Sequence, residues 1–228
     1  MKLSRIKLLL LATFLLVTAT VAYAQPDGAN VTIVSVETKA ANAPGQIVAD
    51  GGNITAANLF SKQKPKAWQG FYGNVSGNLS LEDATGDIMY SWVVANVSGI
   101  VLASRNSTIT WSTVAGVENC TVDEDLTGKG SEAVSNVFTN ASVNFAIGAV
   151  NITAACHSYA YVNSAAQAVD FETIIASATD VTSIYTTRIE PATTGFDGST
   201  MDYQFMVPDD KKKAVTTTYY FYIEFYNP

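Results

Sequence analysis

Apolar and polar residues alternate with a period of two in the part of the chain that begins near Trp68. Val75, Gly77, Leu79 and Leu81 alternate with asparagine and serine residues. This pattern is typical of a β-strand that has one buried face and one solvent face. The polar positions, which include two candidate glycosylation sites, are therefore expected on the solvent face.

The same stretch continues into two further runs of this kind. Residues 83–86 supply turn chemistry, alternation resumes over 88–94, and a third apolar run occupies 100–104. Short turns between such runs favour antiparallel pairing of consecutive strands. The segment predicts a three-stranded antiparallel meander.

Other alternating or β-branched runs predict strands on both sides of the meander. Short strands and turns are expected over 40–58, and longer strands over 30–38, 106–114, 142–153, 154–162, 169–177, 181–189, 201–207 and 216–226. The chain has no alternating helix and strand rhythm and no internal repeat. It predicts an all-β fold, a single antiparallel β-sandwich of about a dozen short strands.

One short helix is expected near residues 131–139. Ser131 can cap its start, Glu132 adds favourable charge in the first turn, and Val134 and Phe138 lie four residues apart. Residues 115–150, which surround this helix, could form an inserted subdomain.

The first 24 residues have the pattern of a secretory signal peptide. Lys2, Arg5 and Lys7 precede an apolar run at 8–21, and Ala22-Tyr23-Ala24 follows as a small-x-small cleavage site. The alternative is an uncleaved anchor helix, but the run is shorter than the roughly 20 residues that span a bilayer. We expect residues 1–24 to be removed and residues 25–228 to form one extracellular domain.

The mature chain would be strongly acidic. The whole chain has 13 basic and 20 acidic residues, and the expected signal peptide carries three of the basic ones. Nucleic acids and anionic membrane surfaces are disfavoured as partners, because they bind clustered lysine and arginine. No second long apolar run follows, so no membrane span is expected after cleavage. Attachment to the cell surface would then depend on other surface proteins or on self-association.

Two cysteines, Cys120 and Cys156, are expected to form one disulfide in an oxidising compartment. Metal binding is the alternative, with His157 as a neighbouring ligand. That set of side chains is too small for a typical metal site.

Nine asparagines stand in N-x-S/T sequons, about three times the number expected by chance for this composition. In an exported protein they predict glycan attachment. They are Asn30, Asn53, Asn74, Asn78, Asn96, Asn106, Asn119, Asn140 and Asn151.

The acidic residues do not make a convincing metal site. Residues 123–125, together with Asp197 and Asp202, could offer oxygen ligands to Ca²⁺, but the spacing does not match an EF-hand loop. Solvated acidic turns are the preferred interpretation. We therefore predict no metal and no cofactor.

Catalytic chemistry is poorly represented. His157 is the only histidine, and the motifs of hydrolases, zinc proteases and nucleotide-binding proteins are absent from the sequence. Glu82, Asp83 and Asp87 fall at one turn, and sequence spacing cannot show the separation that a glycosidase pair needs. The protein is not expected to be an enzyme.

Aromatic residues allow two interpretations. Six of them could form a platform that stacks on sugars, or they could belong to the core and rim of a sandwich, which we favour; they are Trp68, Phe71, Tyr72, Tyr90, Trp92 and Trp111. The last strand has aromatic residues on both faces. Its outer row, Tyr220, Tyr222 and Tyr226, is either covered by protein or part of an interface.

Several blocks of the sequence suggest a family. They are WQGFYGNVSGNLSLEDATGDIMYSW, VLASRNSTITW, GFDGSTMDYQFMVP and TTTYYFYIEF. In these blocks the chain resembles secreted surface proteins of archaea. The resemblance covers most of the mature chain and implies an extracellular, glycosylated β-protein. It brings no catalytic residues.

The leading hypothesis is a structural cell-surface protein, an envelope or filament subunit. A terminal strand of one subunit could enter the sheet of the next, and residues 30–38 are the candidate donor. A carbohydrate-binding module or adhesin that uses exposed aromatics is the alternative. An extracellular enzyme is the least favoured class.

Overall fold

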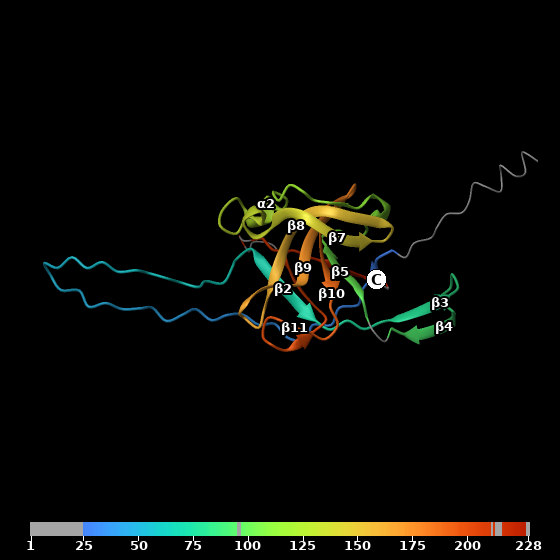
Figure 1. Cartoon of the computed structure of the whole chain (residues 1–228), viewed down its shortest axis with the longest axis horizontal. Helices are drawn as coiled ribbons and strands as arrows, with labels where there is room; N and C mark the ends of the chain where they lie inside the picture. Colours follow the sequence, from blue (N-terminus) through green and yellow to red (C-terminus); the bar gives the residue numbers. More distant parts are fainter. Residues whose placement is uncertain (1–24, 95–96, 211, 213–215, 227–228) are drawn as a thin grey trace, which may run out of the picture.

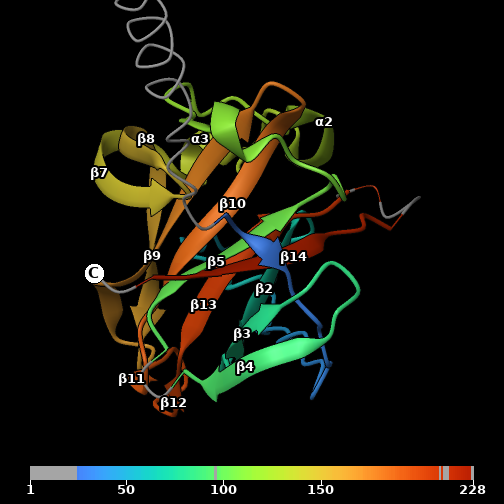
Figure 2. The same ribbon diagram turned by 90° about the vertical axis from the view of Figure 1, so that its right-hand side faces the viewer.

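The computed structural model describes residues 25–94, 97–210, 212 and 216–226, so the expected signal peptide and Asn96 lie outside the described part. An antiparallel sheet organises the body of the molecule (Figures 1 and 2). Its strands follow the order β1 (Asp27–Gly28), β14 (Tyr220–Phe225), β5 (Gly99–Ser104), β10 (Val181–Ile189), β9 (Ala166–Ala178), β8 (Val150–Val162) and β7 (Thr139–Ile147), and β6 (Ala115–Gly116) pairs with β9.

A second, smaller layer covers one face of this sheet. It is the antiparallel pair β2 (Trp68–Gly73) and β13 (Tyr203–Pro208). Phe205 and Val207 of β13 share a buried cluster with Val101, Ile175 and Tyr185 of the main sheet. The all-β, sandwich-like fold predicted from the sequence is confirmed.

The opposite face of the sheet is covered by its own far end. Phe145, Ile147 and Ile152, from β7 and β8, pack in one cluster with Leu102 of β5 and Ile184 of β10. The backbone N–H of Gly148, in the turn between β7 and β8, donates to Oε2 of Glu224 on β14 at 2.8 Å. The sheet is therefore so strongly curved that the turn between β7 and β8, at one end, contacts β14 near the other end.

Three short helical turns complete the fold. They are a 3-10 turn η1 (Trp111–Thr113), α2 (Glu124–Thr127) and α3 (Val134–Val137). The helix expected near 131–139 is present as α3, but Ala133 and not Ser131 precedes it without a side-chain cap. The prediction of a strand over 106–114 is wrong, because Trp111 begins η1 and packs against Tyr222.

The predicted three-stranded meander is also wrong. β3 (Asn78–Glu82) and β4 (Ile88–Val93) pair only with each other, whereas β5 pairs with β10 and β14. The reason lies in burial. Every residue of β5 is buried, so this strand needs neighbours and cover on both sides.

The first mature strand, expected over 30–38, is not formed, and neither are short strands over 40–58. These residues have suitable β-propensity but no ladder partner among the described residues, of which only Asp27–Gly28 pairs with the free edge of β14. One expected strand, 142–153, is divided by the turn at Gly148. None of the helices in the described part of the chain is long and apolar enough to cross a membrane.

The remaining short strands, β11 (Thr193–Thr194) and β12 (Thr200–Met201), pair with each other. Residues 115–138 do not have a core of their own, because Val117, Val134 and Phe138 join the cluster under β13. The last strand is covered on both sides except at its first residue, Tyr220, which is 44% exposed. Phe221 packs with Phe71, while Tyr222 is buried with the opposite cluster.

Candidate functional site

A long arm, residues 29–66, leaves the body and returns to it (Figure 1). Its first end is fixed where the Ala29 N–H donates to the Phe221 carbonyl at 2.9 Å. Its second end is fixed by Glu132, whose carboxylate accepts from the Lys66 and Ala67 N–H groups at 2.9 and 2.6 Å. The arm therefore has two anchored roots.

Between its roots the arm is exposed along its whole length. Its large apolar side chains are from 58% to 102% exposed, namely Val31, Ile33, Val34, Val36, Ile47, Val48, Ile54, Leu59 and Phe60. An exposed apolar surface of this extent is typical of an interaction site. No residue from 30 to 66 has a backbone ladder partner.

The two limbs of the arm approach each other at a group of lysines. Lys39 Nζ donates to the Lys62 carbonyl at 3.3 Å, and Lys64 Nζ donates to Thr38 Oγ1 at 3.4 Å. The ammonium groups of Lys39 and Lys64 and the backbone of Lys62 thus lie where the two limbs meet. Glu37 is the acidic residue nearest to them in the sequence.

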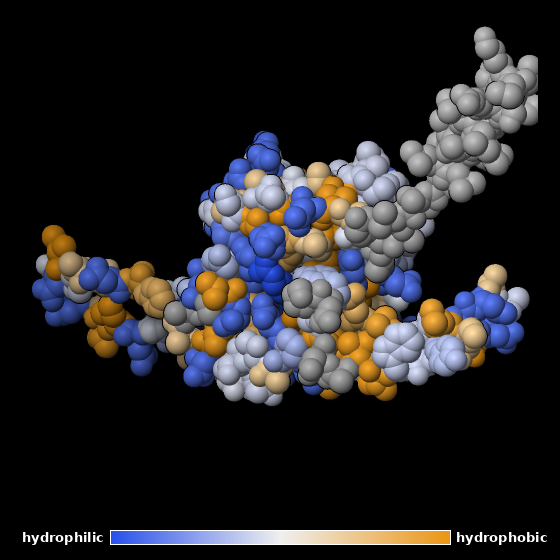
Figure 3. Space-filling view, turned by 45° about the vertical axis from the view of Figure 1, so that its right-hand side comes forward, coloured by the Kyte–Doolittle hydropathy of each residue, from blue (hydrophilic) through white to orange (hydrophobic). Residues whose placement is uncertain are grey.

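The β3–β4 hairpin is the second exposed element (Figure 3). Leu79 lies opposite Trp92, and Leu81 lies opposite Tyr90. Cross-strand partners share a face of the pair. These four side chains, which we call the hairpin apolar face, are from 42% to 61% exposed. The other face carries Ser80 opposite Ser91 and Asn78 opposite Val93, so it is mixed in polarity.

The turn of the hairpin is acidic. Leu81, Glu82, Asp83, Asp87, Ile88 and Met89 line a shallow depression there. Asp83 Oδ1 accepts from the Thr85 hydroxyl and N–H and from the Asp87 N–H, at 2.7 to 3.0 Å. These bonds lower the pKa of Asp83, the Thr85 hydroxyl first among them. The turn therefore carries its negative charge in a fixed loop.

The candidate sugar platform is not one surface. Trp68 stacks on Phe138 with ring centroids 5.9 Å apart, and its Nε1 donates to the Glu132 carbonyl. Trp111 is turned toward Tyr222. The interpretation as core and rim holds for these residues, whereas Tyr90 and Trp92 are exposed on the hairpin.

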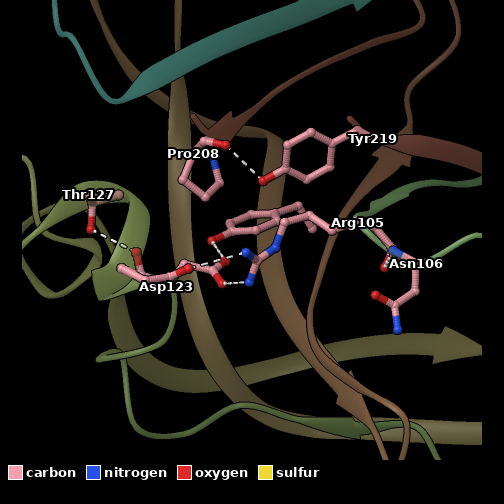
Figure 4. A network of polar contacts seen from close by, with 9 residues as sticks. Arg105, Asn106, Asp123, Thr127, Pro208 and Tyr219 are labelled. Carbon is pink, nitrogen blue, oxygen red and sulfur yellow. Dashed lines mark hydrogen bonds and ion pairs between the residues drawn. The ribbon is translucent and has the colours of Figure 1, made fainter. Parts of the chain in front are cut away.

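The acidic segment 123–125 is only in part the solvated turn that the sequence indicates, since Asp125 is exposed and Asp123 is not. Asp123 is buried, with a φ of 55°, and its carboxylate accepts from Arg105 Nη2 at 2.5 Å and from the Tyr185 hydroxyl at 2.8 Å (Figure 4). Burial raises the pKa of Tyr185 well above its ordinary value. The network joins the 115–138 segment to β10 and has a structural role.

The carboxylates of Asp202 and Asp197 also accept hydrogen bonds from other groups of the protein. Asp202 Oδ2 accepts from the Val75 N–H at 2.8 Å and Oδ1 from the Ala192 N–H at 3.0 Å. Asp197 accepts from Ser199. Among the described residues, no three His, Cys, Asp or Glu side chains are grouped as metal ligands would be.

The single histidine is hydrogen-bonded to a carboxylate on the curled sheet. His157 Nδ1 lies 2.8 Å from Glu172 Oε1, and Arg188 Nη1 lies 3.2 Å from Glu172 Oε2. The Arg188 guanidinium covers the Phe145 ring at 4.0 Å. Each of these three polar side chains therefore has an interaction partner within the protein.

Cys120 and Cys156 form the expected disulfide and close a loop across a sequence separation of 36 residues. In the chain-entropy description, such a link stabilises the folded state by about 4 kcal/mol. It ties the 115–138 segment to β8.

Eight of the nine sequon asparagines are in the described part of the chain, and all eight are exposed. They lie on the arm (Asn30, Asn53), near or on β3 (Asn74, Asn78) and on the body (Asn106, Asn119, Asn140, Asn151). Asn106 Nδ2 donates to the Asp180 carbonyl and Asn53 Nδ2 to Asp50, so a glycan there would leave one amide hydrogen for each of these bonds.

Sequence reasoning missed the lysine group of the arm and the exposure of the hairpin apolar face. The charge distribution holds a signal for the first: residues 29–66 have four lysines and two acids, whereas the rest of residues 25–228 has six basic and eighteen acidic residues. No protein-family model, curated protein sequence or solved structure matches this chain.

Proposed function

We propose that this chain is a secreted, N-glycosylated structural protein of the cell surface that self-assembles through its N-terminal arm. The observation that carries the proposal is the state of residues 29–66. They present nine large apolar side chains to solvent without a ladder partner. Leaving this surface in water is unfavourable, and a second copy can remove it by accepting the arm as an added strand.

The body does not depend on the arm for its own core. Both buried clusters are built from residue 75 onward, with Trp68 and Phe71 packed at the margin. An arm that contributes little to its own subunit is free to stabilise another. Exposed sequon asparagines support the extracellular part of the proposal, since glycans require accessible acceptors.

The first test is microscopy of the mature protein after deletion of residues 25–38. We expect the full chain to form filaments or a lattice in negative stain and the truncated chain to stay monomeric. Fibres formed by the truncated chain would overturn strand donation.

A second variant keeps the length of the arm. Val31→Ser, Ile33→Ser, Val34→Ser and Val36→Ser together remove the apolar surface of the first limb, and Thr32→Ser with Ser35→Thr is the matched control. All six residues are exposed, so the melting temperature of the monomer should not change. We expect the fourfold variant alone to lose assembly.

The alternative function, a carbohydrate-binding module or adhesin, rests on Tyr90 and Trp92, which are 61% and 50% exposed. They alternate on β4 and so share a face that could stack on sugar rings. Binding to a glycan array by the monomer, lost in Trp92→Ala, would favour this function. Trp68 is not a suitable position for that test, because it is packed on Phe138.

A further inference from the structure

We propose that the β3–β4 hairpin of one copy is the acceptor for the arm of a second copy, and that the acidic hairpin turn pairs with the arm lysines Lys39, Lys62 and Lys64. This inference rests on the proposed self-assembly and names the surface that receives the arm.

The hairpin is incomplete in the monomer. An isolated two-stranded hairpin is at best marginally stable in water, and a third strand or a packed face is needed to stabilise it. β3 and β4 pair with no other strand in the described part of the chain. The hairpin apolar face, with Leu79, Leu81, Tyr90 and Trp92, is uncovered although its alternation is that of a strand with one buried side.

The first limb of the arm has the chemistry of the missing strand. Residues 31–36 contain four β-branched aliphatic side chains and one threonine, the types that fit a pleated surface best. Their backbone has no ladder partner. Added at an edge of the hairpin, this limb would gain main-chain hydrogen bonds and cover part of the apolar face.

Charge complementarity also favours pairing of the arm with the hairpin. The arm has an excess of two positive charges in a mature chain that is otherwise strongly acidic. Lys39, Lys62 and Lys64 are held together by the contacts between the two limbs. Glu82, Asp83 and Asp87 line the turn of the hairpin. Complementary groups of this kind set the register of a complex and speed its formation.

The positions of the two elements require a second copy. The arm and the hairpin leave the body on opposite sides (Figures 1 and 3). An arm that extends away from its own hairpin can meet the hairpin of a neighbour. Such a contact joins two different surfaces, so repeating it produces an open filament unless the rotation closes a ring.

The test is a charge reversal followed by its compensation. Glu82→Lys with Asp87→Lys gives the turn of the hairpin a positive charge, so that it repels the arm lysines. We expect the lowest concentration at which filaments sediment to rise about tenfold or more. Adding Lys62→Glu and Lys64→Glu in the same chain should restore it to within about threefold of the unmodified protein.

The matched control is Glu118→Lys with Asp210→Lys, which makes an equal change of net charge elsewhere on the body. It should assemble as the unmodified protein does. Melting curves of the monomers check the fold, and no large change is expected because the hairpin contributes to neither buried cluster.

A second variant tests the apolar face without altering charge. Leu81→Ser with Trp92→Ser should abolish sedimentation and leave the monomer folded. If this variant and the charge-reversed variant assemble normally, while deletion of residues 25–38 blocks assembly, the acceptor is wrong and the proposed function stands. The pairing of the arm lysines with the hairpin turn is also overturned if the compensated variant does not recover assembly, or if the control variant loses assembly to the same extent as the charge-reversed one.

Discussion

At the scale of single residues, buried acids control how the outer segments are held. Asp123 has its carboxylate between Arg105 and Tyr185, in a left-handed backbone conformation that asparagine also tolerates. Asp123→Asn should therefore remove the charge without straining the backbone. We expect the free energy of unfolding to fall by about 2 kcal/mol, because a hydrogen-bonded charge pair is lost inside the protein.

Urea denaturation measures this change. Asp125→Asn is the matched control, since Asp125 is 67% exposed and lies 3.4 Å from the same guanidinium. Its effect should stay below about 0.5 kcal/mol. Equal effects of the two substitutions would contradict the structural role given to Asp123.

Glu224 makes stability depend on pH. Burial raises the pKa of its carboxyl above the ordinary value of 4.5, and burial does the same for Glu190. The folded protein therefore keeps these protons at pH values where the unfolded chain has lost them. Stability is highest at or below the unfolded pKa and falls as pH rises through the folded pKa.

Glu224→Gln should make that fall less steep. The amide keeps an oxygen for the Gly148 N–H but has no proton to lose. Unfolding free energies compared at about pH 4.5 and about pH 7 should show the variant gaining stability relative to the unmodified protein at the higher pH. A constant difference between the two proteins would show that Glu224 does not titrate in this way.

At the scale of elements, the start of β5 depends on the absence of a side chain. Gly99 has a φ of 147°, and a Cβ at this position would collide with the Glu224 carbonyl of β14. Gly99→Ala should cost about 2–4 kcal/mol, through backbone strain and the separation of two paired strands.

Thermal unfolding provides the measurement. Gly130→Ala is the control, because a Cβ added to Gly130 would have no atom within 4 Å and its φ is not in the left-handed region. We expect that change to stay within about 0.5 kcal/mol. A tolerated Gly99→Ala would mean that β5 and β14 can separate at this end.

Strand predictions succeeded where both neighbours of a strand lie in the same chain. The range expected for β10, 181–189, is the observed one, and it pairs with β5 on one side and β9 on the other. Residues 30–38 have similar propensity and no such partner, so they form no strand. Alternation in β3 and β4 correctly indicated strands, but the face it marked as buried is exposed in the monomer.

The polar sites were harder to anticipate for a related reason. Asp123 has the sequence pattern of a solvated acid because nothing in its sequence neighbourhood indicates Arg105 or Tyr185, which approach it from the end of β5 and from β10. The disulfide was predictable, since a chain with two cysteines allows only one intramolecular pairing. The arm lysines come together only because the limbs fold back on each other.

At the scale of the whole molecule, the structure divides into a body with two buried clusters and an arm that is absent from both. Limited trypsin digestion tests this division. Lys39, Lys62 and Lys66 are exposed and are not followed by proline, so the monomer should be cut there first. The body should remain folded, with its melting temperature lowered by no more than about 2 °C.

Lys129 is an internal control. It is exposed on the body, and it lies between the disulfide-linked Cys120 and Cys156, so a cut there leaves both fragments joined until reduction. In sedimented filaments the arm sites should become protected while Lys129 remains accessible. Loss of the native circular dichroism after arm cleavage would show that the body depends on the arm, and equal cleavage of the arm in monomers and filaments would show that assembly does not cover it.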